Sequence, residues 1–295
     1  MIAATAKLTR ALQVRSPGRP VPGVTRLSRM LVRLLPVSPA VVTLPNGVRM
    51  LLDAGVDAQR ELLFSGVYQP ALANVLRQYV GPGAYCLDIG ANLGYFALDF
   101  ARRAGAAGRV AAFEANPTLA EALAAQARLN GFDHLRVHKR AVFETSGQAL
   151  TFYISTHPGK SSLDAALAGT TTREITVETV AIDDFIQAQG WTRLDAIKCD
   201  VEGADAPALL GAQASILRYR PFIAFEFSAS TAPNLIDQLR TLFAQANYRL
   251  ELLHLSGKRQ PFAWHVPTPL DHIDVLCAPM PSAQPGTQTR RSSIG

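Results

Sequence analysis

The chain has 295 residues, of which 48% are hydrophobic. This is enough for one sizeable core, and no apolar run approaches the roughly 18–20 residues that would cross a bilayer. The formal net charge is +6, but ten of the 29 basic residues lie in residues 1–52 and beyond Met280, where there is no acidic residue. The rest of the chain is therefore net acidic, which argues against nucleic-acid binding by the main domain.

Residues 1–37 form a basic N-terminal segment with one predicted amphipathic helix, VTRLSRMLVRLLP, over residues 24–36. The leucines and the arginines of this stretch fall on different helical faces. Two interpretations stay open: the helix packs on the body, or it makes peripheral contact with an anionic membrane surface. There is no signal-peptide pattern, and Cys86, Cys199 and Cys277 form no CxxC pair. We therefore expect a cytoplasmic protein with reduced cysteines.

Residues 38–83 are predicted to form a hairpin followed by a helix. Two apolar runs flank Asn46-Gly47, a dipeptide typical of a type I′ hairpin turn. Residues 70–80 have a helical pattern, and the Gly-Pro-Gly sequence after them ends it. This region therefore leads into the main domain, which is expected over residues 84–280.

The main domain alternates between predicted strands and helices. Strands are expected at 84–90, 109–115, 134–142, 193–203 and 220–228, and helices at 95–105, 117–131, 204–217 and 232–247. Two further strands, 248–255 and 271–278, have no helix between them, so we expect one of them to run antiparallel. The pattern predicts an α/β fold with a Rossmann-like, doubly wound, mostly parallel sheet covered on both faces. An insert between Glu144 and Asp183 carries two strand-like runs, and residues 281–295 are predicted to be a disordered tail.

The stretch CLDIGANLG, residues 86–94, joins the first strand of this domain to its first helix, where doubly wound sheets bind ligands. An NAD fingerprint would need glycines at 90, 92 and 95, but the chain has Gly90, Asn92 and Tyr95. Asn92 tolerates the left-handed conformation better than most residues and adds a hydrogen-bond donor and an acceptor. With Asp88 and Gly94, these mixed groups favour a ligand that has a zwitterionic amino-acid end.

An acid also follows the second strand of the domain, in the sequence AAFEANP. Glu114 lies 26 residues after Asp88, and an acid at this place in the fold is suited to accept both hydroxyl protons of a ribose. A carboxylate there would repel a 2′-phosphate. We therefore expect Glu114 to bind a ribose that carries no 2′-phosphate.

A second group of acids follows two later strands. Asp200, Glu202 and Asp205 lie within IKCDVEGAD, and Glu226 ends the next strand. Asp205 is interpreted as favouring the N-terminus of the following helix. Asp200, Glu202 and Glu226 are the catalytic candidates, because three carboxylates at one sheet edge either hold a hard cation such as Mg²⁺ or orient and deprotonate a hydroxyl. The sequence leaves both alternatives open.

Several motifs in a fixed order carry a resemblance to a known family. They span roughly residues 60–230 and are LDIGANLGYFAL, AAFEANP, KSSL, TVAIDDF and DAIKCDVEGADAPALLGA. The chain resembles the FkbM-type methyltransferases, within the Rossmann-like class that depends on S-adenosylmethionine.

The resemblance implies a seven-stranded sheet with an antiparallel last pair. It also implies methyl transfer from S-adenosylmethionine, usually to a hydroxyl oxygen of a sugar, a glycan or glycolipid, or a natural product. By position, the methionine part would contact Asp88, Gly90, Asn92 and Gly94, the ribose would contact Glu114, and the adenine would contact Ala141 and Val142. Asp200 would face the site of methyl transfer.

Two other function classes remain. An NAD-linked reductase on the same fold would also use an acid such as Glu114, but the sequence lacks the three-glycine fingerprint. A non-catalytic cofactor-binding or interaction module would use the basic N-terminal helix to contact its partner. The acids at positions 200 and 202 favour an active enzyme over such a module.

Overall fold

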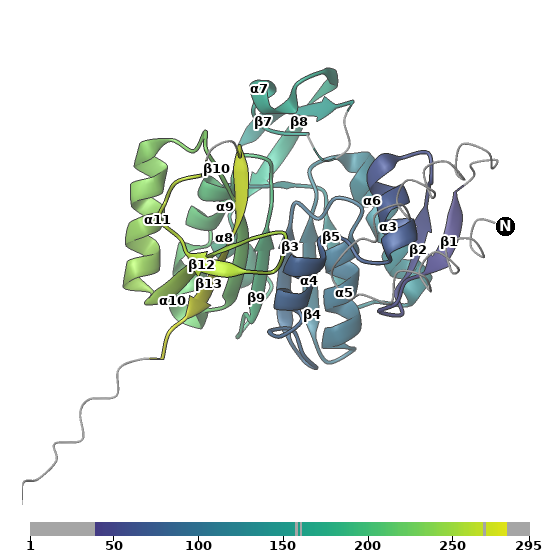
Figure 1. The fold of residues 1–295 in the computed structure, drawn as a ribbon, viewed down its shortest axis with the longest axis horizontal. Coiled ribbons are helices and arrows are strands. Elements are labelled where there is room, and N and C mark those ends of the chain that lie inside the picture. The colour runs from purple at the N-terminus through teal and green to yellow at the C-terminus, as the bar shows by residue number, and fades with distance from the viewer. Residues whose placement is uncertain (1–38, 157–158, 160, 268–269, 282–295) are drawn as a thin grey trace, which may run out of the picture.

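The computed structural model describes residues 39–156, 159, 161–267 and 270–281 (Figure 1). The predicted helix over residues 24–36 and the predicted tail from residue 282 onward lie outside this part. Packing or membrane contact by residues 24–36 therefore stays a prediction. None of the described helices is both long enough and apolar enough to cross a membrane.

The main sheet has the strand order β12-β11-β13-β10-β9-β3-β4-β5. Its parallel strands are β3 (Tyr85–Ile89), β4 (Arg109–Phe113), β5 (Leu135–His138), β9 (Ala196–Cys199) and β10 (Phe222–Ser228). β13 (His272–Pro279) runs antiparallel between β10 and β11 (Tyr248–Leu253), which confirms the expected antiparallel strand. A short edge strand, β12 (Arg259–Pro261), adds an eighth strand to the seven that were expected.

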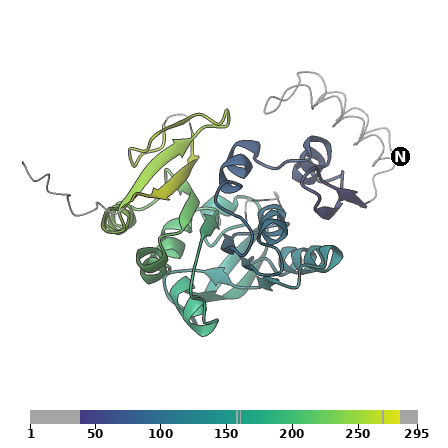
Figure 2. The same cartoon turned by 90° about the horizontal axis from the view of Figure 1, so that it is seen from below.

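Helices cover both faces of this sheet (Figures 1 and 2). One core joins alternate residues of the central strands to α5 (Tyr95–Ala104) and α6 (Pro117–Asn130). The other core lies under the helices of the opposite face, which are α8 (Ile182–Ala188), α9 (Asp205–Leu210), α10 (Gln213–Tyr219) and α11 (Pro233–Gln245). The α/β, doubly wound architecture predicted from the sequence is therefore confirmed.

The N-terminal lead-in consists of β1 (Ala40–Thr43), β2 (Arg49–Leu52), α3 (Asp57–Ser65) and α4 (Pro70–Leu76). The predicted hairpin is confirmed, but its predicted type I′ turn is wrong. In the turn, Gly47 has φ 81° while Asn46 is not among the residues with positive φ. Pro45 fixes φ near −65° at the first central position, which excludes a type I′ turn and favours a type I turn closed by a left-handed glycine.

Side-chain amides of α6 hold the lead-in against the main domain. The Leu51 N–H donates to Gln126 Oε1 at 2.9 Å, and Gln126 Nε2 donates to the Leu51 carbonyl at 3.1 Å. Asn130 makes the same pair of bonds with Arg49, at 2.8 and 2.7 Å. These bonds pair the backbone N–H and C=O groups on the edge of β2 that does not face β1, so the hairpin is fixed in place beside the domain.

The insert forms a separate three-stranded sheet of β6 (Ala141–Val142), β8 (Thr171–Val180) and β7 (Ala149–Ser155), with the short helix α7 (Ala165–Ala168). It stands above the strand ends of the main sheet in the view of Figure 1. The two strand-like runs are confirmed as β7 and β8. The single strand expected over residues 134–142 is wrong, because its last two residues leave the main sheet and pair with β8.

The helix expected over residues 204–217 is also divided, into α9 and α10. Gly211 sits at the break, and a Cβ there would lie 2.2 Å from the Phe143 carbonyl oxygen. Asp183 then accepts hydrogen bonds from the Ala214 and Ser215 amides, each at 2.8 Å. The contact between Gly211 and the insert therefore ends α9, and Asp183 of α8 caps the start of α10.

Candidate active site

The glycine loop connects β3 to α5 in the conformation that its residue types predict. Gly90, Asn92 and Gly94 all have positive φ, at 72°, 51° and 93°. The expectation that Asn92 adopts the left-handed conformation is confirmed. A Cβ on Gly90 would lie 1.9 Å from the Asp200 carbonyl oxygen, so only glycine permits this approach of the loop to the end of β9.

Glu114 follows β4 and links the loop to the next strand connection. Its Oε2 accepts a hydrogen bond from the Asn92 N–H at 2.7 Å, and its Oε1 accepts one from the Asn116 N–H at 2.8 Å. The residue is 7% exposed, and burial raises the pKa of its carboxyl above the usual range. Both oxygens are thereby oriented while the carboxylate still faces the pocket described next.

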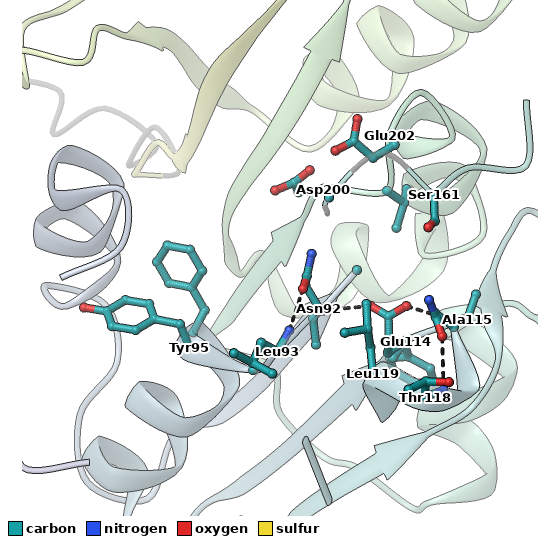
Figure 3. Close-up of a pocket in the computed structure, with 18 of the residues that line it drawn as sticks. Asn92, Leu93, Tyr95, Glu114, Ala115, Thr118, Leu119, Ser161, Asp200 and Glu202 are labelled. Atoms are coloured by element: carbon teal, nitrogen blue, oxygen red, sulfur yellow. Dashed lines mark hydrogen bonds between the residues drawn. The ribbon is translucent and has the colours of Figure 1, made fainter. Parts of the chain in front are cut away.

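A pocket lies over the carboxyl ends of β3, β4 and β9. Its volume of about 390 Å³ is within the roughly 300–1,000 Å³ typical of small-molecule sites. Figure 3 shows Asn92 and Asp200 facing each other across it, with Tyr95 at one end and Ala115 and Thr118 at the other. Of the predicted site residues, the pocket is lined by Gly90, Asn92, Gly94, Glu114, Ala141, Val142, Asp200 and Glu202. The fold thus brings together residues that are up to 112 positions apart.

Two predicted site residues do not reach the pocket wall. Asp88 is fully buried beneath the loop, and neither of its oxygens has a hydrogen-bond partner in the described structure. Burial raises the pKa of Asp88 to about 6. Glu226 lies at the end of β10, outside the pocket lining, directly opposite Asp274 on β13. His272 Nε2 is 3.6 Å from Glu226 Oε1.

Lys198 is the site residue to which the sequence analysis gave no role. Its side chain is buried between two predicted acids, with Nζ 3.1 Å from Asp200 Oδ2 and 3.8 Å from Asp88 Oδ1. Nζ also donates to the Gly90 carbonyl at 3.2 Å. Burial acts to lower the pKa of Lys198, but the Asp200 and Asp88 carboxylates more than offset this and raise it. The signal in the sequence is a lysine in the apolar strand AIKC, since such a charge needs a buried partner.

The segment after β9 turns sharply toward the pocket. Glu202 has φ 51° and Gly203 has φ 94°, so two successive residues are left-handed. The hydroxyl of Ser162, which lies between β7 and α7 of the insert, donates to the Glu202 carbonyl at 2.8 Å. Ser161 and Ser162 belong to the KSSL motif, and Ser161 lines the pocket. The insert therefore supports the turn that presents Glu202 (Figure 3).

The acids of this edge do not form a metal centre. In the described residues, no group of three or more His, Cys, Asp or Glu side chains is arranged to hold a metal ion. The magnesium alternative from the sequence therefore has no support in this part of the chain. Asp205, interpreted as favouring a helix N-terminus, is the first residue of α9, and burial raises its pKa to about 7.

The doubly wound sheet, the loop with a left-handed asparagine and the oriented acid after β4 are typical of α/β domains that bind nucleoside cofactors. Within that class, the chain belongs to the FkbM methyltransferase domain family, whose profile matches residues 88–250. No curated protein sequence matches the chain.

Three solved structures illustrate what the chain is similar to. The methyltransferase FkbM from Methylobacillus flagellatus KT is 17% identical with a TM-score of 0.44, over 74% of this chain and 52% of that one. The S-adenosylmethionine-dependent O-methyltransferase from Thermotoga maritima is 12% identical with a TM-score of 0.40, over 74% and 68%. Aeropyrum pernix fibrillarin, in complex with S-adenosyl-L-methionine, is 14% identical with a TM-score of 0.42, over 83% and 98%. The chain thus spans about half of the Methylobacillus protein.

Proposed function

We propose that the protein transfers a methyl group from S-adenosylmethionine to a hydroxyl oxygen of a small molecule, a glycan or a glycolipid. The observation that carries the proposal is the Asp200 carboxylate, which reaches the pocket wall beside the glycine loop and is held there by Lys198 at 3.1 Å. Asp200 is therefore placed to receive the proton that an acceptor hydroxyl must lose.

The pocket residues fit the proposed cofactor. Gly90 lets the loop approach the Asp200 backbone closely, and Asn92 offers an amide on the pocket wall, so the loop suits the methionine part. The fixed carboxylate of Glu114 suits two ribose hydroxyls. Ala141 and Val142 provide small apolar surface for the adenine. Asp88 would support the loop from below, since it is fully buried.

When it is bound, S-adenosylmethionine supplies an activated methyl group, so the protein has mainly to orient the acceptor and remove its proton. The Asp200 carboxylate accepts that proton in our proposal, and Lys198 fixes its position. Glu202 lines the same wall and is the second candidate for this role. Glu226 lies outside the pocket lining, so we assign it no contact with the acceptor.

Calorimetric titration with S-adenosylhomocysteine tests the cofactor assignment. We expect saturable binding that is lost in Glu114→Ala but kept in Glu121→Ala, because Glu121 is an exposed glutamate on α6 whose side chain is 67% accessible. NAD⁺ titrated in parallel tests the reductase alternative. Binding of NAD⁺ without binding of S-adenosylhomocysteine would contradict the proposed function.

A second experiment separates catalysis from cofactor binding. Asp200→Asn keeps the shape of the side chain but removes the proton acceptor, so we expect S-adenosylhomocysteine binding to persist while methyl transfer to a hydroxylated acceptor is lost. Normal turnover in this variant would show that Asp200 is structural. Wild-type protein that binds the cofactor but methylates no hydroxylated compound would favour the non-catalytic module.

A further inference from the structure

The pocket has a second arm that the cofactor assignment does not use. Its lining residues come from the lead-in (Val56, Leu62 and Tyr68) and from the glycine loop and the start of α5 (Leu93, Tyr95 and Phe96). The lead-in precedes residues 88–250, which match the family profile. This arm is therefore formed partly by residues that lie outside the matched range.

Three aromatic rings form the wall of this arm. The Tyr68 ring lies 6.1 Å from the rings of both Tyr95 and Phe96, in edge-to-face arrangements. Tyr95 and Phe96 are buried, whereas Tyr68 is 38% exposed. Tyr68 thus presents an accessible aromatic surface that is held in place by two buried rings.

Two polar side chains of the arm already accept hydrogen bonds within the protein. Gln59 Oε1 accepts a hydrogen bond from the Asp53 N–H at 2.9 Å, and the Tyr95 hydroxyl accepts one from Arg77 at 3.3 Å. Lys198 is occupied by carboxylates and a carbonyl oxygen. A sugar would need several new partners for its hydroxyls, and desolvating them without such partners is costly. The arm therefore favours an apolar occupant.

The arm also lies at the end of the pocket that the cofactor assignment leaves for an acceptor. Tyr95 and Ala115 stand at opposite ends, and Asp200 lies between them (Figure 3). The ribose is assigned to Glu114, which adjoins Ala115, so the Tyr95 end remains for the second substrate. A ring seated against Tyr68 would have its hydroxyl directed toward Asp200 at the middle of the pocket.

We propose that the aromatic arm binds the methyl acceptor, and that this acceptor is an apolar ring compound with a hydroxyl, such as a phenol, rather than a sugar. The inference rests on the proposed function and selects one substrate class from those it allows. The lead-in is then the specificity-determining part of the enzyme.

The test uses 2-naphthol and methyl glucoside as probes, titrated into the complete protein saturated with S-adenosylhomocysteine. We expect 2-naphthol to bind and methyl glucoside not to bind. Tyr68→Ala should weaken 2-naphthol by about fivefold, the factor that corresponds to ~1 kcal/mol of aromatic contact. Tyr68→Phe keeps the ring and should retain the affinity, as should Leu217→Ala, which changes an equally exposed residue on α10.

Three outcomes would overturn the proposal: preference for methyl glucoside, 2-naphthol affinity unchanged in Tyr68→Ala, or equal loss of S-adenosylhomocysteine affinity in that variant. The last would mean that the arm belongs to the cofactor site. Failure of the proposed function would look different, because wild-type protein would then either not bind S-adenosylhomocysteine or methylate no hydroxylated compound. Titration of 2-naphthol without the cofactor would still report on the arm in that case.

Discussion

Replacing Asp88 with Asn tests how the charge beneath the glycine loop is held. Burial raises the pKa of Asp88 to about 6, from an ordinary value of 3.8. An acid with a raised pKa in the folded state binds more protons when folded, so its stabilising effect is complete below pH 3.8 and is lost as pH rises through about 6. At about 1.4 kcal/mol per pKa unit, ionised Asp88 costs about 3 kcal/mol above pH 7.

Asn cannot ionise, so the variant should lack this pH dependence. Between pH 4.5 and 7.5, the stability of wild type relative to Asp88→Asn should fall by about 2 kcal/mol. Urea unfolding at both pH values measures the difference, and Asp237→Asn, at a position where the side chain is 72% exposed, serves as the control. Parallel changes in wild type and Asp88→Asn would refute the argument that burial penalises this carboxylate.

Three further variants test the ion pairs of Lys198, the glycine loop and the contact between α6 and the lead-in. Lys198→Met leaves two carboxylates without their buried cation, so we expect a loss of about 3–5 kcal/mol in urea unfolding and of methyl transfer, whereas wild-type stability would contradict the ion pairing. Gly90→Ala places a Cβ 1.9 Å from a carbonyl oxygen and should abolish S-adenosylhomocysteine binding in calorimetry; Gly105→Ala, with φ 62° and no atom within 4 Å, should cost only about 1 kcal/mol of stability. Gln126→Ala removes both hydrogen bonds to Leu51 and should cost about 1–3 kcal/mol, with faster hydrogen exchange of the Leu51 amide; unchanged exchange would contradict its anchoring role.

Much of the fold follows from local patterns. The strands of the main domain are short apolar runs separated by helical periodicity, and this alternation alone predicts a parallel sheet with helices on both faces. The positive φ of Asn92 follows from its residue type and its place between two glycines. Ile197 and Cys199 enter one core while Lys198 and Asp200 pair on the other face, as the two-residue period of a strand requires.

The remaining features depend on contacts between distant segments. The break at Gly211 arises because the insert approaches that residue, and no local pattern encodes this approach. The change of sheet after His138 likewise needs β8 as a partner. The aromatic arm combines Tyr68 with Tyr95 across a loop and a helix, so the sequence shows its rings but not their meeting.

The structure also distinguishes the three predicted catalytic acids. Burial, together with the negative charge of Asp200, raises the pKa of Glu226 to about 9, so Glu226 carries a proton at neutral pH and cannot accept one from an acceptor. Asp274, directly opposite, has a pKa that burial raises to about 6, so at neutral pH the proton on Glu226 is what relieves the repulsion between these two carboxyl groups. Asp200 alone combines contact with the buried Lys198 and access to the pocket, where its side chain is 24% exposed. A proton acceptor has to meet both conditions, because the cation fixes its position and the opening lets the hydroxyl reach it. Turnover should therefore survive Glu226→Gln far better than Asp200→Asn, and the reverse order would move the catalytic role to β10.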